Sequence, residues 1–205
     1  MDKAVLDEVK ERSEIYKLIV AKDAISQAMV TAHLFINNEI DKDHLLYRQL
    51  HDALVVNYGK AFSSMNPFGT IDKKWSIFTD EMSEIAHKAI INQRNKMVGH
   101  RDFIPEGVMI YQKGVEMPLG EIATSVKNEI LHKFIAPDDI KFVAVVSADL
   151  ITRMTLEISD RMKAVYGEDG EKIEGALELM TEDDVELIKA ENDRLRKLKA
   201  INAKN

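Results

Sequence analysis

One short stretch of the chain combines the residue types that handle phosphate groups and protons. Residues 94–102 read Arg-Asn-Lys-Met-Val-Gly-His-Arg-Asp, with three cations and one histidine before the first acid, Asp102. An imidazole moves protons near neutral pH, and a guanidinium binds phosphate oxygens through two parallel hydrogen bonds. In a chain whose net charge is −7, this stretch is the best candidate for an anion-binding site.

These groups suit RNA cleavage without a metal. His100 can take the proton from a ribose 2′-OH or give one to the leaving 5′-oxygen. Arg94 can stabilise the charge that accumulates on the phosphorane-like transition state. Asn95 can orient an imidazole nitrogen or a phosphate, whereas Lys96 and Arg101 would bind the substrate. We expect no metal and no cofactor.

The two proposed catalytic side chains still have to be brought together. On a straight helix, residues six positions apart are about 120° apart around the axis and about 9 Å apart along it. Gly99 directly precedes His100 and predicts a helix end or a turn there. A two-fold dimer would instead place Arg94 of one chain near His100 of the other. The sequence leaves both arrangements open.

The stretch resembles the R-(polar)-x-x-x-x-H signature of the HEPN superfamily, in particular its abortive-infection and toxin-like branch. Residues 57–62, Asn-Tyr-Gly-Lys-Ala-Phe, also resemble a helix motif of that branch. The similarity in helix order and length covers roughly residues 40–165, and the specific matching is confined to the two short segments.

This resemblance implies an up-and-down helical bundle that is usually dimeric. In active members of the family it implies a metal-independent endoribonuclease with Arg and His as catalytic residues. Arg94 and His100 would then be the catalytic pair, with Asn95 as the polar residue after Arg. A toxin-like role also implies RNA as the substrate and a neutralising antitoxin protein as a partner.

A second pattern is typical of a different chemistry. Glu84 and His87, and likewise Glu129 and His132, have the E-x-x-H spacing of di-iron carboxylate bundles. We do not favour this interpretation, because residues 103–118 between the two motifs contain no predicted helix. On a helical wheel, Glu84 and His87 also lie away from the stripe that we expect to face the core: Met82, Ile85, Ala89, Gln93 and Met97.

A third hypothesis is a non-catalytic helical bundle that binds a nucleotide, a nucleic acid or a protein partner. It predicts that Arg94 and His100 are dispensable for the biological effect. Under this hypothesis Arg94 is a surface cation, and His100 belongs to a helix C-cap, where a cation complements the helix dipole.

The hydrophobic periodicity predicts that helices position these residues. The expected helices cover about 3–38, 42–65, 72–99, 119–135 and 138–167. Residues 103–118 read as a long loop in which Val108–Tyr111 can be extended. Tyr58 and Trp75 are expected to pack in the core. We therefore expect an all-α fold: an up-and-down, HEPN-like bundle of about five helices over residues 1–167. Residues 168–205 form a charged tail with a last helix from about Thr181.

Composition supports this fold class and excludes several functions. Apolar residues make up 45% of the chain, while nine Gly and four Pro are too few for an all-β sandwich or barrel. The absence of Cys excludes a disulfide scaffold, a thiolate zinc site and a cysteine nucleophile. No signal peptide or long apolar run is evident, so we expect a cytoplasmic homodimer without membrane association. The acidic balance argues against a general nucleic-acid coat, but it allows one local anion site.

Overall fold

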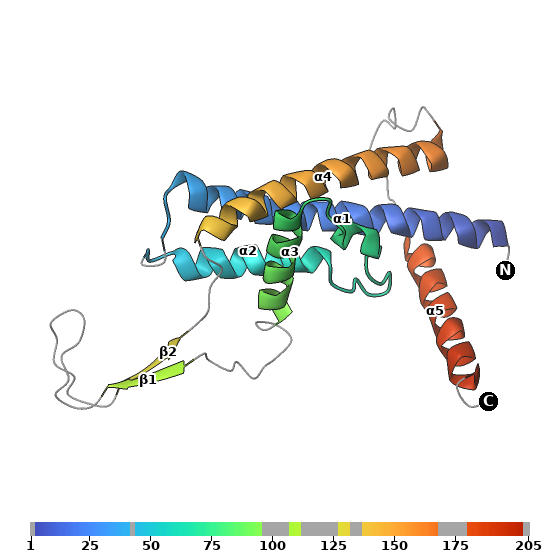
Figure 1. The fold of residues 1–205 in the computed structure, drawn as a ribbon. Helices are drawn as coiled ribbons and strands as arrows, with labels where there is room; N and C mark the ends of the chain where they lie inside the picture. The colour runs from blue at the N-terminus through green and yellow to red at the C-terminus, as the bar shows by residue number, and fades with distance from the viewer. Residues whose placement is uncertain are drawn as a thin grey trace.

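The fold was analysed in a computed structural model, which describes residues 3–41, 44–95, 107–111, 127–131, 137–167 and 180–202. The elements are α1 (Lys3–Asn37), α2 (Tyr47–Ala61), the 3-10 turn η1 (Lys73–Ser76), α3 (Glu81–Arg94), β1 (Gly107–Tyr111), β2 (Lys127–Leu131), α4 (Pro137–Tyr166) and α5 (Glu182–Asn202) (Figure 1). The predicted all-α bundle is confirmed.

The long helix α1 is the centre of the bundle. It contacts α2 and α4, with α2 beside its C-terminal half, and α3 packs against α2 and α4 (Figure 1). Four small residues of α1 are almost fully buried: Ala21, Ala24, Ala28 and Ala32. Small side chains let helix backbones approach closely, and Leu54 and Tyr58 of α2 and Leu150 and Met154 of α4 fill the remaining core.

The predicted helix over 72–99 is wrong in its first part, because α3 begins only at Glu81. Asp72 does cap a helical turn, because its Oδ1 accepts from Lys74 N at 2.7 Å, but that turn is only η1. The chain is then extended at Ile77, and α3 begins at Glu81, where Asp80 Oδ1 accepts from Ser83 N at 2.8 Å. Trp75 is buried in the core as predicted.

The predicted helix over 119–135 is wrong at residues 127–131. These residues form β2, which pairs antiparallel with β1 in the register Gly107↔Leu131 to Tyr111↔Lys127. The predicted extended piece, Val108–Tyr111, is the partner strand. Short apolar runs fit helix and strand alike, and here the hydrogen bonds come from a partner strand whose paired residues lie 16 to 24 positions earlier in the chain. In the described part of the chain, the bundle therefore contains four helices besides α5.

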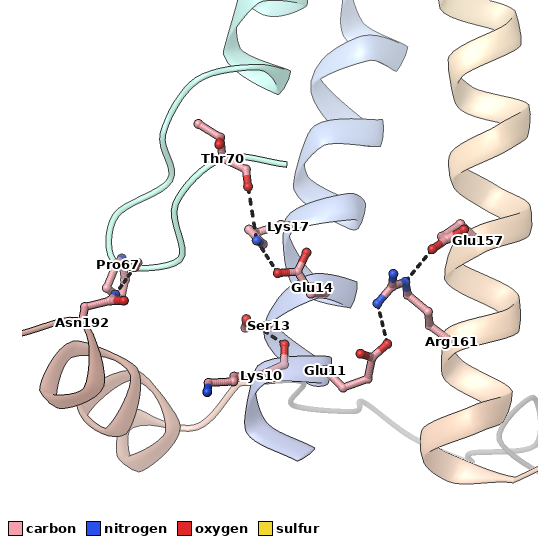
Figure 2. A network of polar contacts seen from close by, with 10 residues as sticks. All are labelled: Lys10, Glu11, Ser13, Glu14, Lys17, Pro67, Thr70, Glu157, Arg161 and Asn192. Carbon is pink, nitrogen blue, oxygen red and sulfur yellow. Dashed lines mark hydrogen bonds and ion pairs between the residues drawn. The ribbon is translucent and has the colours of Figure 1, made fainter. Parts of the chain in front are cut away.

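The charged tail contains the predicted last helix, and its first half docks on the bundle. Thr181 and Asp184 cap α5 reciprocally: Asp184 Oδ2 accepts from Thr181 N, and Thr181 Oγ1 accepts from Asp184 N. Asp184 also accepts from Arg12 of α1 at 2.7 Å. Asn192 Nδ2 donates to Pro67 O at 2.9 Å (Figure 2). Ile188 is buried, whereas Leu195, Leu198 and Ile201 beyond Asn192 are exposed.

Within the described residues, one helix passes a simple test for a membrane span. By length and composition, α1 is apolar and long enough to cross a bilayer. The core helix of a soluble protein passes the same test, and the apolar side of α1 is occupied by α2 and α4. The expected absence of membrane association stays a prediction.

Replacing Asp184 by Ala should release α5 from the bundle. The change removes both the helix cap and the ion pair with Arg12, which together contribute about 1–2 kcal/mol. We expect faster amide hydrogen exchange throughout α5 with unchanged exchange in α1 and α4. Asp183→Ala, one residue earlier and exposed, is the matched control. Unchanged protection of α5 in Asp184→Ala would show that the apolar contacts alone hold this helix.

Candidate functional site

Arg94 is the last residue of α3, and its side chain crosses α2 at Gly59. A Cβ atom on Gly59 would lie 2.4 Å from Arg94 Cγ and 3.0 Å from both Cβ and Cδ. No real side chain tolerates such a contact without movement, so the absence of a side chain at Gly59 makes room for the arginine stem. The close approach of α2 and α3 therefore determines where the guanidinium lies.

Neutral acceptors orient the guanidinium of Arg94. Its Nη2 donates to Ser63 Oγ at 2.8 Å, and its Nη1 donates to Asn95 Oδ1 at 3.1 Å. The Ser63 hydroxyl donates in turn to the carbonyl of Gly59 at 2.8 Å. Because Ser63 has one hydroxyl proton, this bond leaves its oxygen free to accept from Arg94. Gly59, Ser63 and Asn95 thus hold the cation from two sides.

No carboxylate among the described residues balances the charge of Arg94. Among the described residues Arg94 forms no ion pair, whereas Arg12, Arg161 and Arg194 each bind Asp or Glu at 2.6–2.7 Å. A guanidinium has five N–H donors, and the two bonds above leave three for a ligand. The carbonyl ends of α2 and α3 lie nearby and stabilise a cation electrostatically. A partly buried arginine of this kind can bind an anion such as phosphate.

A buried polar pair, Tyr58 of α2 and His87 of α3, also holds these two helices together. Tyr58 Oη and His87 Nδ1 are 3.0 Å apart, and the rings of Phe62 and Phe78 contact the imidazole. Burial raises the pKa of Tyr58 far above its usual value and lowers the pKa of His87 to about 4, so both groups are neutral near pH 7. Tyr58 is the core residue that the sequence predicted.

The expected core stripe of α3 is wrong. The buried residues are Ser83, Ala86, His87 and Ile90, whereas Met82 and Ile85 are 46% and 52% exposed. His87 can face the core because Tyr58 satisfies one of its ring nitrogens, so that the cost of burying an imidazole is small. A helical wheel that ranks residues by hydrophobicity cannot detect such a partner.

The di-iron interpretation fails on geometry. Glu129 lies in β2, where residues three positions apart do not share a face as they do on a helix. His87 is occupied by Tyr58, and the described residues contain no group of three potential metal ligands. His132 lies outside the described residues.

A separate cavity of about 500 Å³ lies between α1, the segment 70–75 and Arg161 of α4. Four cations line it, but three of them form ion pairs. Lys17 binds Glu14, and Arg161 binds Glu11 and Glu157 (Figure 2). Lys74 also binds Glu157. Lys17 Nζ also donates to Thr70 O at 3.2 Å. Because its cations are largely neutralised, this cavity is a weaker anion site than Arg94.

The structure places two of the five predicted site residues. Arg94 and Asn95 are in direct contact, and Lys96, His100 and Arg101 lie outside the described residues. Ser63 and the packing role of Gly59 were missed. A glycine inside an amphipathic helix is a signal of close backbone approach, but its partner cannot be read from local sequence.

Comparison with protein-family models, curated proteins and solved structures found no match for this chain. Membership of the HEPN superfamily therefore stays a prediction. Of the two segments on which that resemblance depends, the structure describes residues 57–62 and the first two residues of 94–100, and Arg94 contacts Gly59.

Stability should fall in mild acid because of His87. Its pKa is about 4 in the folded protein and about 6.5 when unfolded, so the unfolded state binds more protons between these values. The contribution of His87 to the free energy of unfolding is fully present above pH 6.5. It should fall by up to about 3 kcal/mol as the pH drops to 4. Urea unfolding across this range measures the slope. His51, whose pKa burial also lowers, adds to it in the same direction.

The variant His87→Asn distinguishes the contribution of His87 from that of His51. Asparagine places an amide near the Nδ1 position of His87 and has no titratable group. The variant should be less stable at pH 7 and should lose most of the pH dependence between 4 and 6.5. If wild type and variant have parallel pH profiles, His87 is not the residue responsible.

Gly59→Ala should displace Arg94 without unfolding α2. Alanine favours the helix over glycine by about 1 kcal/mol, which offsets part of the steric cost. We expect a melting temperature within a few degrees of wild type and loss of any function that requires Arg94. Alanine at Asn57, on the same helix but away from Arg94, is the control. Full function in Gly59→Ala would mean that the position of the guanidinium is unimportant.

Proposed function

We propose that this protein is a metal-independent endoribonuclease of the toxin or phage-defence type. It cleaves RNA by attack of the ribose 2′-OH on the adjacent phosphorus, which breaks the bond to the 5′-oxygen. The products are a 2′,3′-cyclic phosphate and a new 5′-OH end. The proposed setting is the cytoplasm, and the proposed substrate is RNA.

The observation that carries the proposal is the state of Arg94. Its guanidinium is held by Ser63 and Asn95, both neutral, and three of its donors remain for a ligand. An arginine that serves only to join two helices is commonly paired with a carboxylate, as Arg12 is with Asp184. Positive charge that is oriented and uncompensated is what a transition state with a doubly charged phosphorane requires.

Each residue of the proposed site has a distinct role. Arg94 binds the phosphate and stabilises the transition state. Asn95 orients Arg94 through its Oδ1, in place of the direct contact with phosphate or imidazole expected from the sequence. His100 transfers the proton, either from the 2′-OH or to the leaving oxygen. Lys96 and Arg101 bind the substrate on either side.

The proposed active form is a homodimer. A two-fold axis near the end of α3 would allow Arg94 of one chain and His100 of the other to share one phosphate. A neutralising antitoxin protein would act by covering this cationic region. A non-catalytic bundle that binds a nucleic acid, a nucleotide or a protein is the alternative, and it uses the same surface without proton transfer.

Arg94→Ala and His100→Ala should each abolish RNA cleavage while the proteins stay folded. We expect a loss of at least 100-fold for either change, because each removes a group that stabilises the transition state or transfers a proton in it. Arg94→Lys should be nearly as inactive, since an ammonium cannot form the two-pronged bond. Sequencing of new 5′-OH ends in total RNA, with circular dichroism as the folding control, measures both effects. EDTA should not change the rate, and the rate should be bell-shaped in pH.

Mixing the two inactive variants tests the shared site. If Arg94 and His100 act across the dimer axis, subunit exchange between them should restore about a quarter of the wild-type rate. No restoration, with active wild type, places the pair within one chain. Activity in both single variants, or its loss in EDTA, would contradict the ribonuclease proposal and favour the non-catalytic bundle.

A further inference from the structure

Two acid-free segments of an acidic chain meet at the contact between α2 and α3. Residues 53–71 and 85–101 contain five Lys or Arg and no Asp or Glu, although 35 acids in 205 residues would place about six in these 36 positions. The sequence separates the two segments, and the contact of Arg94 with Gly59 and Ser63 joins them. Among the described residues of the junction, Lys88 is paired with Glu84, whereas Lys60 and Arg94 form no ion pair, in a protein whose net charge is −7.

Lys60 is the only charged residue in residues 53–71. It lies close in sequence to Ser63, which accepts a hydrogen bond from Arg94. Lys60 lies in the last turn of α2, and its carbonyl accepts from the backbone N–H of Ser63, just beyond the helix end, at 3.1 Å. Lys60 is exposed and forms no ion pair among the described residues. Other surface lysines, such as Lys74 and Lys189, are bound to glutamates.

Lys60 and Arg94 differ in how they can bind phosphate. Arg94 is oriented by two hydrogen bonds and suits a two-pronged contact with one phosphate. Lys60 has a flexible stem and a compact charge, which suits a backbone whose exact position varies. Together they provide one oriented contact and one adaptable contact on the same surface.

We propose that the α2–α3 junction binds the sugar–phosphate backbone of single-stranded RNA, with Lys60 contacting a phosphate next to the one held by Arg94. Lys60 is thus a substrate-binding residue and takes no part in proton transfer. This inference rests on the proposed function, because that function is the reason to choose RNA among polyanions.

The experiment measures the salt dependence of binding to a 12-nucleotide single-stranded DNA, which lacks the 2′-OH and cannot be cleaved. Each lost phosphate contact on a single strand should reduce the slope of log K against log salt by about 0.7. Lys60→Gln should therefore make the slope of log K against log salt less steep by about 0.7. It should also weaken binding severalfold at 50 mM salt. Lys3→Gln, which makes the same charge change at the distant N-terminal end of α1 (Figure 1), should leave both unchanged.

Cleavage assays distinguish this inference from the proposed function. Lys60→Gln should raise KM for RNA severalfold and leave kcat within about twofold of wild type, because it removes ground-state binding. If wild type cleaves RNA while Lys60→Gln keeps the wild-type slope and KM, the inference is wrong and the function stands. If the slope falls but wild type never cleaves, the surface binds nucleic acid and the ribonuclease proposal fails. Tighter binding of a polyaspartate peptide of equal charge would overturn the choice of RNA.

Discussion

The close packing of α3 on α2 at Gly59 is the constraint on which the candidate site depends. A side chain at this position would occupy the space of the Arg94 stem. With glycine there, the guanidinium reaches Ser63, whose hydroxyl is itself held by the carbonyl of Gly59. The Tyr58–His87 pair fixes the same two helices from within the core. The position of one cation is thus set by helix packing, which is stiffer than a surface loop.

The neutral partners of Arg94 distinguish it from the other arginines of the bundle. A carboxylate partner, as Arg12 and Arg161 have, neutralises the charge and adds to stability. Ser63 and Asn95 orient the guanidinium but leave its positive charge available to a ligand. This arrangement lacks the Coulomb attraction of an ion pair and relies on hydrogen bonds to neutral oxygens. The sequence segments that contain Lys60 and Arg94, residues 53–71 and 85–101, also have no Asp or Glu that could neutralise these cations.

The segment that begins with Ser63 is supported from two further helices. Lys17 of α1 donates to Thr70 O, and Asn192 of α5 donates to Pro67 O. Met65 and Gly69 close the segment on themselves through two backbone hydrogen bonds of 2.8 and 2.9 Å. Ser63 therefore stands at the start of a restrained connection, and α5 contributes to the support although it belongs to the charged tail.

The sequence by itself determined the all-α class, the extents of α1 and α4, the last helix, and the burial of Tyr58 and Trp75. Those features follow from local periodicity and capping, which a single chain segment carries. It also predicted Arg94 as a candidate anion-binding residue, because an acid-free cationic stretch is visible without coordinates, and that role stays a prediction. Tertiary structure alone decided that β2 is a strand, that His87 faces the core, and that Gly59 and Ser63 hold Arg94. Each of these depends on a partner distant in sequence, and the free energy of such a pairing is not encoded in the spacing of neighbouring residues.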